Sequence, residues 1–283
     1  MKFFFQIVFF FILSSSCQNA SEKIENKVTK SVTLKNDTIW NFTSKTPMVF
    51  IQSGTYQPLY GVKNKEVKVS SFLIDVYPVT NQEFKDFVIT HPDWRKSNIK
   101  KLFADKNYMF AWQKDTILPE NLEEKAPITN ISWYAAKAYC DCQGKRLPTV
   151  DEWEYIAMAD ESRKDARKEE SYNKMIISQY EKPKTYLNLV GLNPKNVWGV
   201  YDLHGLVWEW TSDFNSVMIT GESRNDFETD NNLFCGSESV NATDLMNYAA
   251  FMRYAFRGSI KADFSVQNLG FRCVKDTILT QKN

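Results

Sequence analysis

The sequence is short of the residues and motifs on which most enzymes depend. Its 283 residues include two histidines and five cysteines. It contains no glycine-rich phosphate loop, no Gly-x-Ser-x-Gly nucleophile elbow and no His-Glu-x-x-His zinc pair. His91 and His204 are expected to be surface or packing residues. The net charge of +1 provides no long-range field to attract nucleic acid or acidic partners.

The composition is that of a folded globular chain. Apolar residues make up 43% and charged residues 24% of the sequence, which argues against wholesale disorder. Aromatic residues are plentiful, at 14%. Such side chains can fill a core or line a carbohydrate- or peptide-binding face, and composition does not separate the two uses.

The N-terminus has the features of a targeting signal. Met1-Lys2 precedes an apolar run, 3–13, that is too short to span a bilayer and suits the core of a signal peptide. The small residues 14–16 and then Cys17 resemble a bacterial lipobox, in which the cysteine is acylated. Plain secretion and an uncleaved anchor are the alternatives. We therefore predict a signal peptide over 1–16 and a bacterial envelope protein that is lipid-anchored to a membrane and faces the periplasm or the surface.

The sequence changes character near residue 46. Residues 17–45 begin with the lipidated cysteine and continue as a polar, flexible tether. Strand-like runs follow at 48–51 and 67–74. Export places the chain in an oxidising compartment, where the four cysteines other than Cys17 allow three disulfide pairings.

Helices are expected at three places in the first part of the domain. Asn81 is a plausible N-cap for one helix, and Ser132 to Cys142 has the spacing of a second. Thr149, with Glu152 three residues later, has the pattern of a capping box. The charged segment 160–185 is expected to be a solvated helix or loop. Beyond residue 188 we expect short strands and turns.

Several motifs follow one another in an order that resembles the formylglycine-generating enzyme, or sulfatase-modifying factor, family. The motifs are Pro78-Val79-Thr80-Asn81, Pro127-Ile128-Thr129-Asn130-Ile131-Ser132-Trp133, Gly144-Lys145-Arg146-Leu147-Pro148-Thr149, Trp198-Gly199-Val200-Tyr201-Asp202-Leu203-His204-Gly205-Leu206-Val207-Trp208-Glu209-Trp210 and Asn268-Leu269-Gly270-Phe271-Arg272-Cys273. The resemblance spans about residues 47–275. It implies one α+β domain over 46–276 with a C-type-lectin-like fold, short helices, small twisted sheets and much irregular backbone, followed by a tail over 277–283.

The resemblance also implies a disulfide and two structural arginines. Cys140 and Cys273 match a disulfide pair of the family, with two buried free thiols as the alternative. Cys142 and Cys235 are left unassigned, either paired or reduced. Arg146 and Arg272 fit buried, salt-bridged roles.

A calcium site is implied by the same comparison. Its ligands would be the side chains of Asp202 and Glu209 and the backbone carbonyls of Gly205 and Val207. Ligation by oxygen alone suits a hard cation. The alternative is that the two carboxylates cap turns. Leu206 stands where the family usually has asparagine.

The sequence departs from the family where the oxidase chemistry takes place. Active relatives hold copper(I) with two cysteine thiolates, since soft sulfur suits that ion. Ala249 stands at one expected ligand position, and the other falls near Asp244. Iron sites with three histidines, found in other branches, need more histidines than this chain has. We therefore expect neither copper nor iron, and name no catalytic residue.

The surroundings of the substrate cleft are nevertheless retained. Trp208, Ser237 and Asn268 match residues that line the cleft in active relatives. Tyr248, Arg253, Tyr254 and Arg257 belong to the segment that would form its wall. Core packing is the alternative for the tyrosines, and it is favoured for Arg257. An aromatic and arginine-rich cleft can hold an extended peptide.

Three functions remain in competition. The first is a non-catalytic module that binds a peptide or protein of the cell envelope in this cleft. The second is an oxidoreductase of altered chemistry that modifies a protein side chain. The third is a structural envelope lipoprotein. The missing cysteine pair favours the first.

Overall fold

The computed structural model describes residues 44–59, 66–217 and 245–277. The predicted signal peptide, Cys17, Cys235, Ser237 and Asp244 lie outside these ranges. Within them, short helices surround small sheets joined by irregular segments, which is the expected α+β class. No helix in these ranges combines the length and the apolar character needed to cross a membrane.

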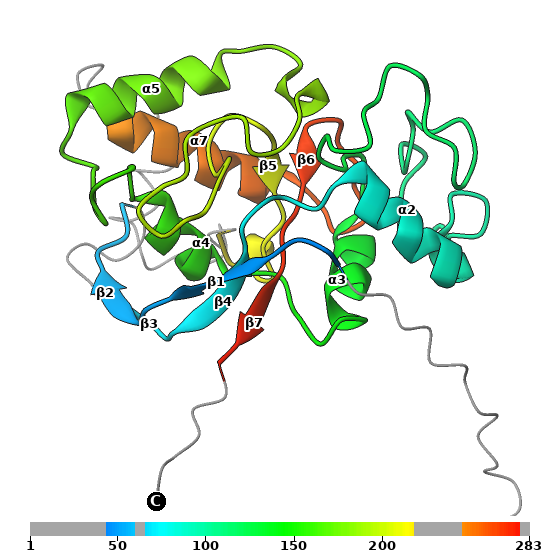
Figure 1. Ribbon diagram of the computed structural model, residues 1–283, viewed down its shortest axis with the longest axis horizontal. Helices are drawn as coiled ribbons and strands as arrows, with labels where there is room; N and C mark the ends of the chain where they lie inside the picture. Colours follow the sequence, from blue (N-terminus) through cyan, green and yellow to red (C-terminus); the bar gives the residue numbers. More distant parts are fainter. Residues whose placement is uncertain (1–43, 60–65, 218–244, 278–283) are drawn as a thin grey trace, which may run out of the picture. The chain divides into compact units, whose positions relative to one another are not determined.

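Three small sheets contain all the named strands of the described ranges. The first has the order β1 (Met48–Ile51), β4 (Phe72–Asp75) and β7 (Val274–Asp276), with antiparallel neighbours that lie side by side in Figure 1. The second pairs β2 (Gly54–Tyr56) with β3 (Val67–Val69), and the third pairs β5 (Trp208–Glu209) with β6 (Leu269–Gly270) in parallel. The run 67–74, expected as one strand, is therefore two strands, because β3 and β4 pair in different sheets.

Five α-helices and three short 3-10 helices make up the helical part of the described ranges. The α-helices are α2 (Asn81–Thr90), α3 (Trp133–Asp141), α4 (Val150–Ala157), α5 (Glu170–Tyr180) and α7 (Leu245–Ser259). The 3-10 helices are η1 (Pro92–Trp94), η2 (Thr185–Leu187) and η3 (Phe214–Val217).

Capping side chains determine where two of the helices begin. The Thr149 hydroxyl accepts from the backbone N–H of Glu152, whose carboxylate accepts from the Thr149 N–H, so the expected capping box of α4 is confirmed. The N-cap of α2 is Thr80 and not Asn81, because Glu83 stands three residues after Thr80 and completes a second box.

The longest α-helix in the described ranges, α7, lies where only strands and turns were expected. It buries Ala249 and Ala250 completely, and Ala249 packs in a cluster with Tyr172 and Ile176 of α5. Figure 1 shows α5 and α7 side by side. The partner of α7 is thus about 75 residues away in sequence, a spacing that local pattern does not reveal.

The predicted disulfide joins α3 to the C-terminal part of the domain. Cys140 and Cys273 are both fully buried and bonded to each other. Phe84, Tyr139 and Phe271 pack against one another in the same core cluster. Cys142 is a free thiol, so of the two states that the sequence left open for it, paired or reduced, the structure has the reduced one.

Candidate binding cavity

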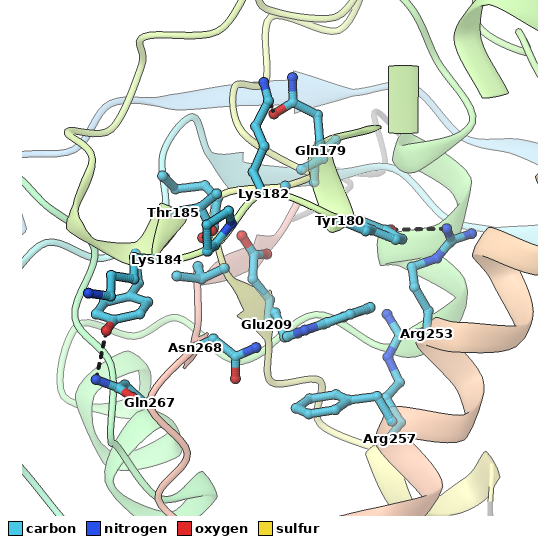
Figure 2. A pocket seen from close by; sticks show the side chains of 18 of the residues that line it. Gln179, Tyr180, Lys182, Lys184, Thr185, Glu209, Arg253, Arg257, Gln267 and Asn268 are labelled. Atoms are coloured by element: carbon cyan, nitrogen blue, oxygen red, sulfur yellow. Dashed lines mark hydrogen bonds between the residues drawn. The ribbon is translucent and has the colours of Figure 1, made fainter. Parts of the chain in front are cut away.

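A cavity of about 500 Å³ opens beside Trp208. One side is formed by the end of α5 and the segment 182–186, and the opposite side by α7. The turn 203–209, residues 267–268 and Trp153 of α4 also belong to the lining. Figure 2 shows Lys182 and Lys184 on one side, Arg253 and Arg257 on the other, and Glu209 and Asn268 between them.

A tight turn brings the floor of the cavity into position. Asp202 and Gly205 both adopt positive φ, 56° and 86°. A Cβ at Gly205 would lie 2.3 Å from Cβ of Gln179 on α5, so only glycine permits this close approach. The backbone N–H of Trp208 then donates to the carbonyl of Asn268 at 2.8 Å, which places these two predicted cleft residues side by side.

Aromatic rings provide the apolar surface of the cavity. Trp208 stacks on Phe256 of α7, with ring centroids 4.9 Å apart and planes 21° apart. Tyr180 contacts the same indole from α5, at 5.0 Å. Because these rings come from three separate segments, the wall exists only when α5, β5 and α7 pack together.

A buried ionic cluster supports the α7 side. The carboxylate of Glu154, on α4, accepts from Arg253 at 2.7 Å and from Arg257 at 2.7 Å. Burial by itself raises the pKa of the Glu154 carboxyl, but the two guanidinium groups outweigh burial and hold the pKa at about 2. Glu154 is therefore ionised at neutral pH, and it carries one negative charge against two positive ones.

A second buried ion pair lies at the floor. Glu209 and Arg272 are each fully buried, and the Glu209 carboxylate accepts from Arg272 Nη2 at 2.8 Å and from Trp153 Nε1 at 2.9 Å. Arg272 is therefore a salt-bridged structural residue, as expected. Arg146 is also salt-bridged, to Glu152 and Asp276.

The four predicted calcium ligands surround this turn, but protein donors already use the carboxylates. The Asp202 carboxylate accepts from the Gly191 N–H at 2.5 Å and from Asn193 Nδ2 at 2.9 Å. Glu209 is held by Arg272, as described above. An ion ligated by these groups and by the carbonyls of Gly205 and Val207 would have to share both carboxylates with the protein. The two carboxylates therefore have hydrogen-bond partners without a metal ion, and calcium at this turn stays a prediction.

The structure separates the predicted cleft residues into three groups. Trp208, Arg253 and Asn268 line the cavity. Tyr254 faces a much smaller cavity next to Glu154, and the Tyr248 side chain is 42% exposed and is not among the lining residues described. Ser237 lies outside the described residues. One turn of α7 thus carries lining and non-lining residues, because consecutive helical residues point in different directions.

Several lining residues were not anticipated from the sequence. Lys182 and Lys184 flank Pro183 at the end of the segment 160–185, for which the sequence predicts only a solvated helix or loop. Arg257, for which the sequence favours core packing over a place in the cleft wall, is buried and also contributes to the lining. The sequence feature that could have pointed to Lys182 and Lys184 is a pair of lysines around a proline after a helical stretch. This pattern alone predicts a binding site only weakly.

None of the described lining residues is a cysteine. Ala249, at an expected copper-ligand position, is fully buried against α5. The free thiol, Cys142, is the C-cap of α3, where it donates to the carbonyl of Tyr139 at 3.0 Å. Burial, with a contribution from the Asp141 carboxylate, raises the pKa of this thiol to about 11. A thiol with this pKa is not an activated nucleophile.

Comparison with known proteins agrees with the order of the motifs. The family model described as "Sulfatase-modifying factor enzyme 1-like domain" matches residues 38–277. A mouse protein named "Inactive C-alpha-formylglycine-generating enzyme 2" is 28% identical over 255 residues, covering 74% of this chain and 76% of that protein. The mouse "Formylglycine-generating enzyme" is 31% identical over 261 residues, covering 76% of this chain and 69% of that protein. Among solved structures, PvdO from Pseudomonas aeruginosa is similar with a TM-score of 0.43 and 19% identity, over 81% of this chain and 94% of that one.

Proposed function

The chain belongs to the sulfatase-modifying factor enzyme family, and from that premise we propose that it is a non-catalytic binding module. It holds a peptide or a segment of a partner protein in the cavity beside Trp208. The observation that carries the proposal is Ala249: the side chain at an expected copper-ligand position is a methyl group buried against α5. A methyl group cannot bind copper, and its burial keeps this position away from a substrate.

The shape and lining of the cavity support binding. Its volume of about 500 Å³ is in the range of sites for small ligands and peptide side chains. Trp208 and Phe256 offer apolar surface, and Asn268 offers an amide that can donate and accept. Two mammalian relatives carry the word "inactive" in their names, which is consistent with members of the family that lack the oxidase activity.

We further propose that the module works in a bacterial envelope, anchored to the membrane by lipid on Cys17. The support is the N-terminal sequence alone. Changing Cys17 to serine is expected to release the protein from the membrane fraction, as measured by immunoblotting after cell fractionation. Retention of the variant in membranes would contradict the lipid anchor.

Structural calcium at the turn around Gly205 remains part of the proposal. If calcium binds there, it raises the midpoint of thermal unfolding, since a ligand of the folded state stabilises it. The Asp202→Asn change is expected to remove the calcium-dependent rise. Equal unfolding midpoints of the native protein in calcium and in EDTA would refute this site.

A pull-down tests the binding function. The full chain is crosslinked in membranes of its own host, and partner recovery is compared between the native protein, Trp208→Ala and Trp94→Ala. Both tryptophans are half-buried, but Trp94 does not line the cavity. We expect Trp208→Ala to lose the partner by about tenfold and Trp94→Ala to retain it, provided that both variants keep the native circular dichroism spectrum.

Two results would count against the proposal. Equal recovery of the partner with both tryptophan variants would favour a structural role for the cavity. Copper-dependent oxygen consumption with a cysteine-containing peptide would restore the oxidoreductase alternative.

A further inference from the structure

The cavity has a local excess of positive charge, although the whole chain is nearly neutral. Among the residues that the structure describes, the charged ones that line it are Lys182, Lys184, Arg253 and Arg257 on the positive side and Glu209 on the negative side. Glu209 is neutralised by Arg272, which lies behind it and does not line the cavity. The acidic side chain at the floor therefore does not compensate the positive charges of the walls.

The two arginines of α7 differ in how their hydrogen bonds are used. Arg253 donates from Nε and Nη2 to Glu154 and from Nη1 to the Tyr180 hydroxyl. Arg257 donates from Nη1 to Glu154, and no described residue accepts a hydrogen bond from its Nε or Nη2. Because Glu154 is shared, the charged donor that remains available at this wall belongs to Arg257.

Burial makes this excess charge significant. The side chains of Arg253, Glu154 and Arg257 are 2%, 8% and 5% exposed. Two guanidinium groups share one hydrogen-bonded carboxylate. The Asp213 carboxylate interacts electrostatically with Arg257 but accepts no hydrogen bond from it, so the second positive charge is only partly compensated, which is costly for a buried group. The Arg257 guanidinium lies 5.0 Å from the centre of the Trp153 ring, a contact that offsets part of this cost. An anion in the cavity would offset more.

We infer that the cavity binds a peptide that carries a carboxylate side chain, Asp or Glu, with the carboxylate at Arg257. This inference rests on the proposed binding function and specifies its ligand. The neighbouring apolar residue of the peptide packs on Trp208 and Phe256, which stack beside the arginine on the same wall. Lys182 and Lys184, across the opening, attract the acidic segment. A cavity of about 500 Å³ with an aromatic wall offers more apolar surface than a free inorganic anion can use.

The experiment compares two pools of blocked hexapeptides with the full mature chain. One pool has a fixed central Phe-Asp and random flanking residues, and the other has Phe-Asn in the same place. Binding is measured by isothermal titration calorimetry. We expect the Asp pool to bind about tenfold more tightly than the Asn pool. The net contribution of a hydrogen bond to a charged group corresponds to about a tenfold change in affinity or more. The preference is expected to shrink as salt is raised.

Variants identify the residues that bind the peptide carboxylate. Arg257→Gln is expected to remove the preference for Asp over Asn. Since this arginine is buried, Lys184→Gln provides a variant with less risk to the fold, and we expect it to weaken the Asp pool about threefold. Lys100→Gln, an exposed lysine that does not line the cavity, is the matched control and is expected to change nothing.

The outcomes separate this inference from the proposed function. Equal binding of the two pools, or binding of neither, overturns the acidic-peptide inference, whereas the pull-down with Trp208→Ala decides the binding function independently. A third titration uses inorganic phosphate alone. If phosphate binds with the same dependence on Lys184 and Arg257 while both peptide pools fail, the cavity is an anion site and not a peptide site.

Discussion

At the scale of single residues, burial determines which polar side chains support the fold and which could act. His204 is half-buried between Tyr172 and Tyr180, where removal from water and the nearby Arg253 lower its pKa to about 4. It is thus a neutral packing residue at pH 7, one of the two roles expected from the sequence. Glu154 remains charged because two arginines hold its pKa low, and Glu209 forms an ion pair with Arg272. The cavity therefore receives its charge from arginine and lysine.

The free thiol gives a test of chemical inertness with a defined pH dependence. The pKa of Cys142 is about 11, so at pH 8 only about one thiol in a thousand is ionised. We expect alkylation by iodoacetamide to be slow at pH 8 and to speed up about tenfold per pH unit up to pH 10. The measurement is peptide mass spectrometry of the Cys142-containing fragment.

The unfolded protein provides the control for this measurement. In urea, Cys142 should react with iodoacetamide at the rate of an ordinary thiol, whose pKa is about 8.5. Rapid alkylation of the folded protein at pH 7 would contradict the raised pKa and would make Cys142 a candidate for chemistry.

At the scale of the elements, sequence patterns located the helices whose start and buried face are set by residues within the helix itself. The helix α4 could be placed from its capping box, and α3 from Ser132 and the apolar spacing that follows it. The helix α7 was missed although local signals were present: Asp244, a residue type that favours the N-cap, directly precedes Leu245, and the helix contains leucine, methionine and alanine.

Two alanines of α7 allow a test of how this helix packs. Ala249 is fully buried against α5, whereas Ala255 is exposed. We expect Ala249→Leu to lower the free energy of unfolding by about 1–3 kcal/mol, because the added atoms have no space. Ala255→Leu should change it by less than about 0.5 kcal/mol.

Urea unfolding followed by circular dichroism measures both variants. Equal effects of the two leucines would mean that α7 does not pack on α5 through Ala249. The position would then be accessible, and the main support for a non-catalytic function would be lost.

At the scale of the whole molecule, one covalent bond joins distant parts of the chain. The Cys140–Cys273 disulfide closes a loop with a sequence separation of 133 residues. Restricting such a loop in the unfolded chain is worth about 5 kcal/mol in the chain-entropy model. We expect the Cys140→Ala/Cys273→Ala double variant to be less stable by about 4–5 kcal/mol in urea unfolding.

Reduction and a matched cysteine change complete this test. Dithiothreitol should destabilise the native protein and leave the double variant unchanged. Cys142→Ala, which removes the neighbouring free thiol, should cost about 1 kcal/mol or less. A native protein insensitive to dithiothreitol in urea would show that this bond adds little to stability.

The sequence by itself determined the family, the α+β class, the disulfide pair and the absence of sulfur at an expected ligand position. These depend on residue identity and on motif order, which do not change on folding. Only the tertiary structure decided that Arg257, Lys182 and Lys184 share one cavity with Trp208, while Tyr248 and Tyr254 do not. The reason is that the segments come from distant parts of the chain. Which face of α7 meets the cavity is set by its packing on α5 and by the shared Glu154 carboxylate.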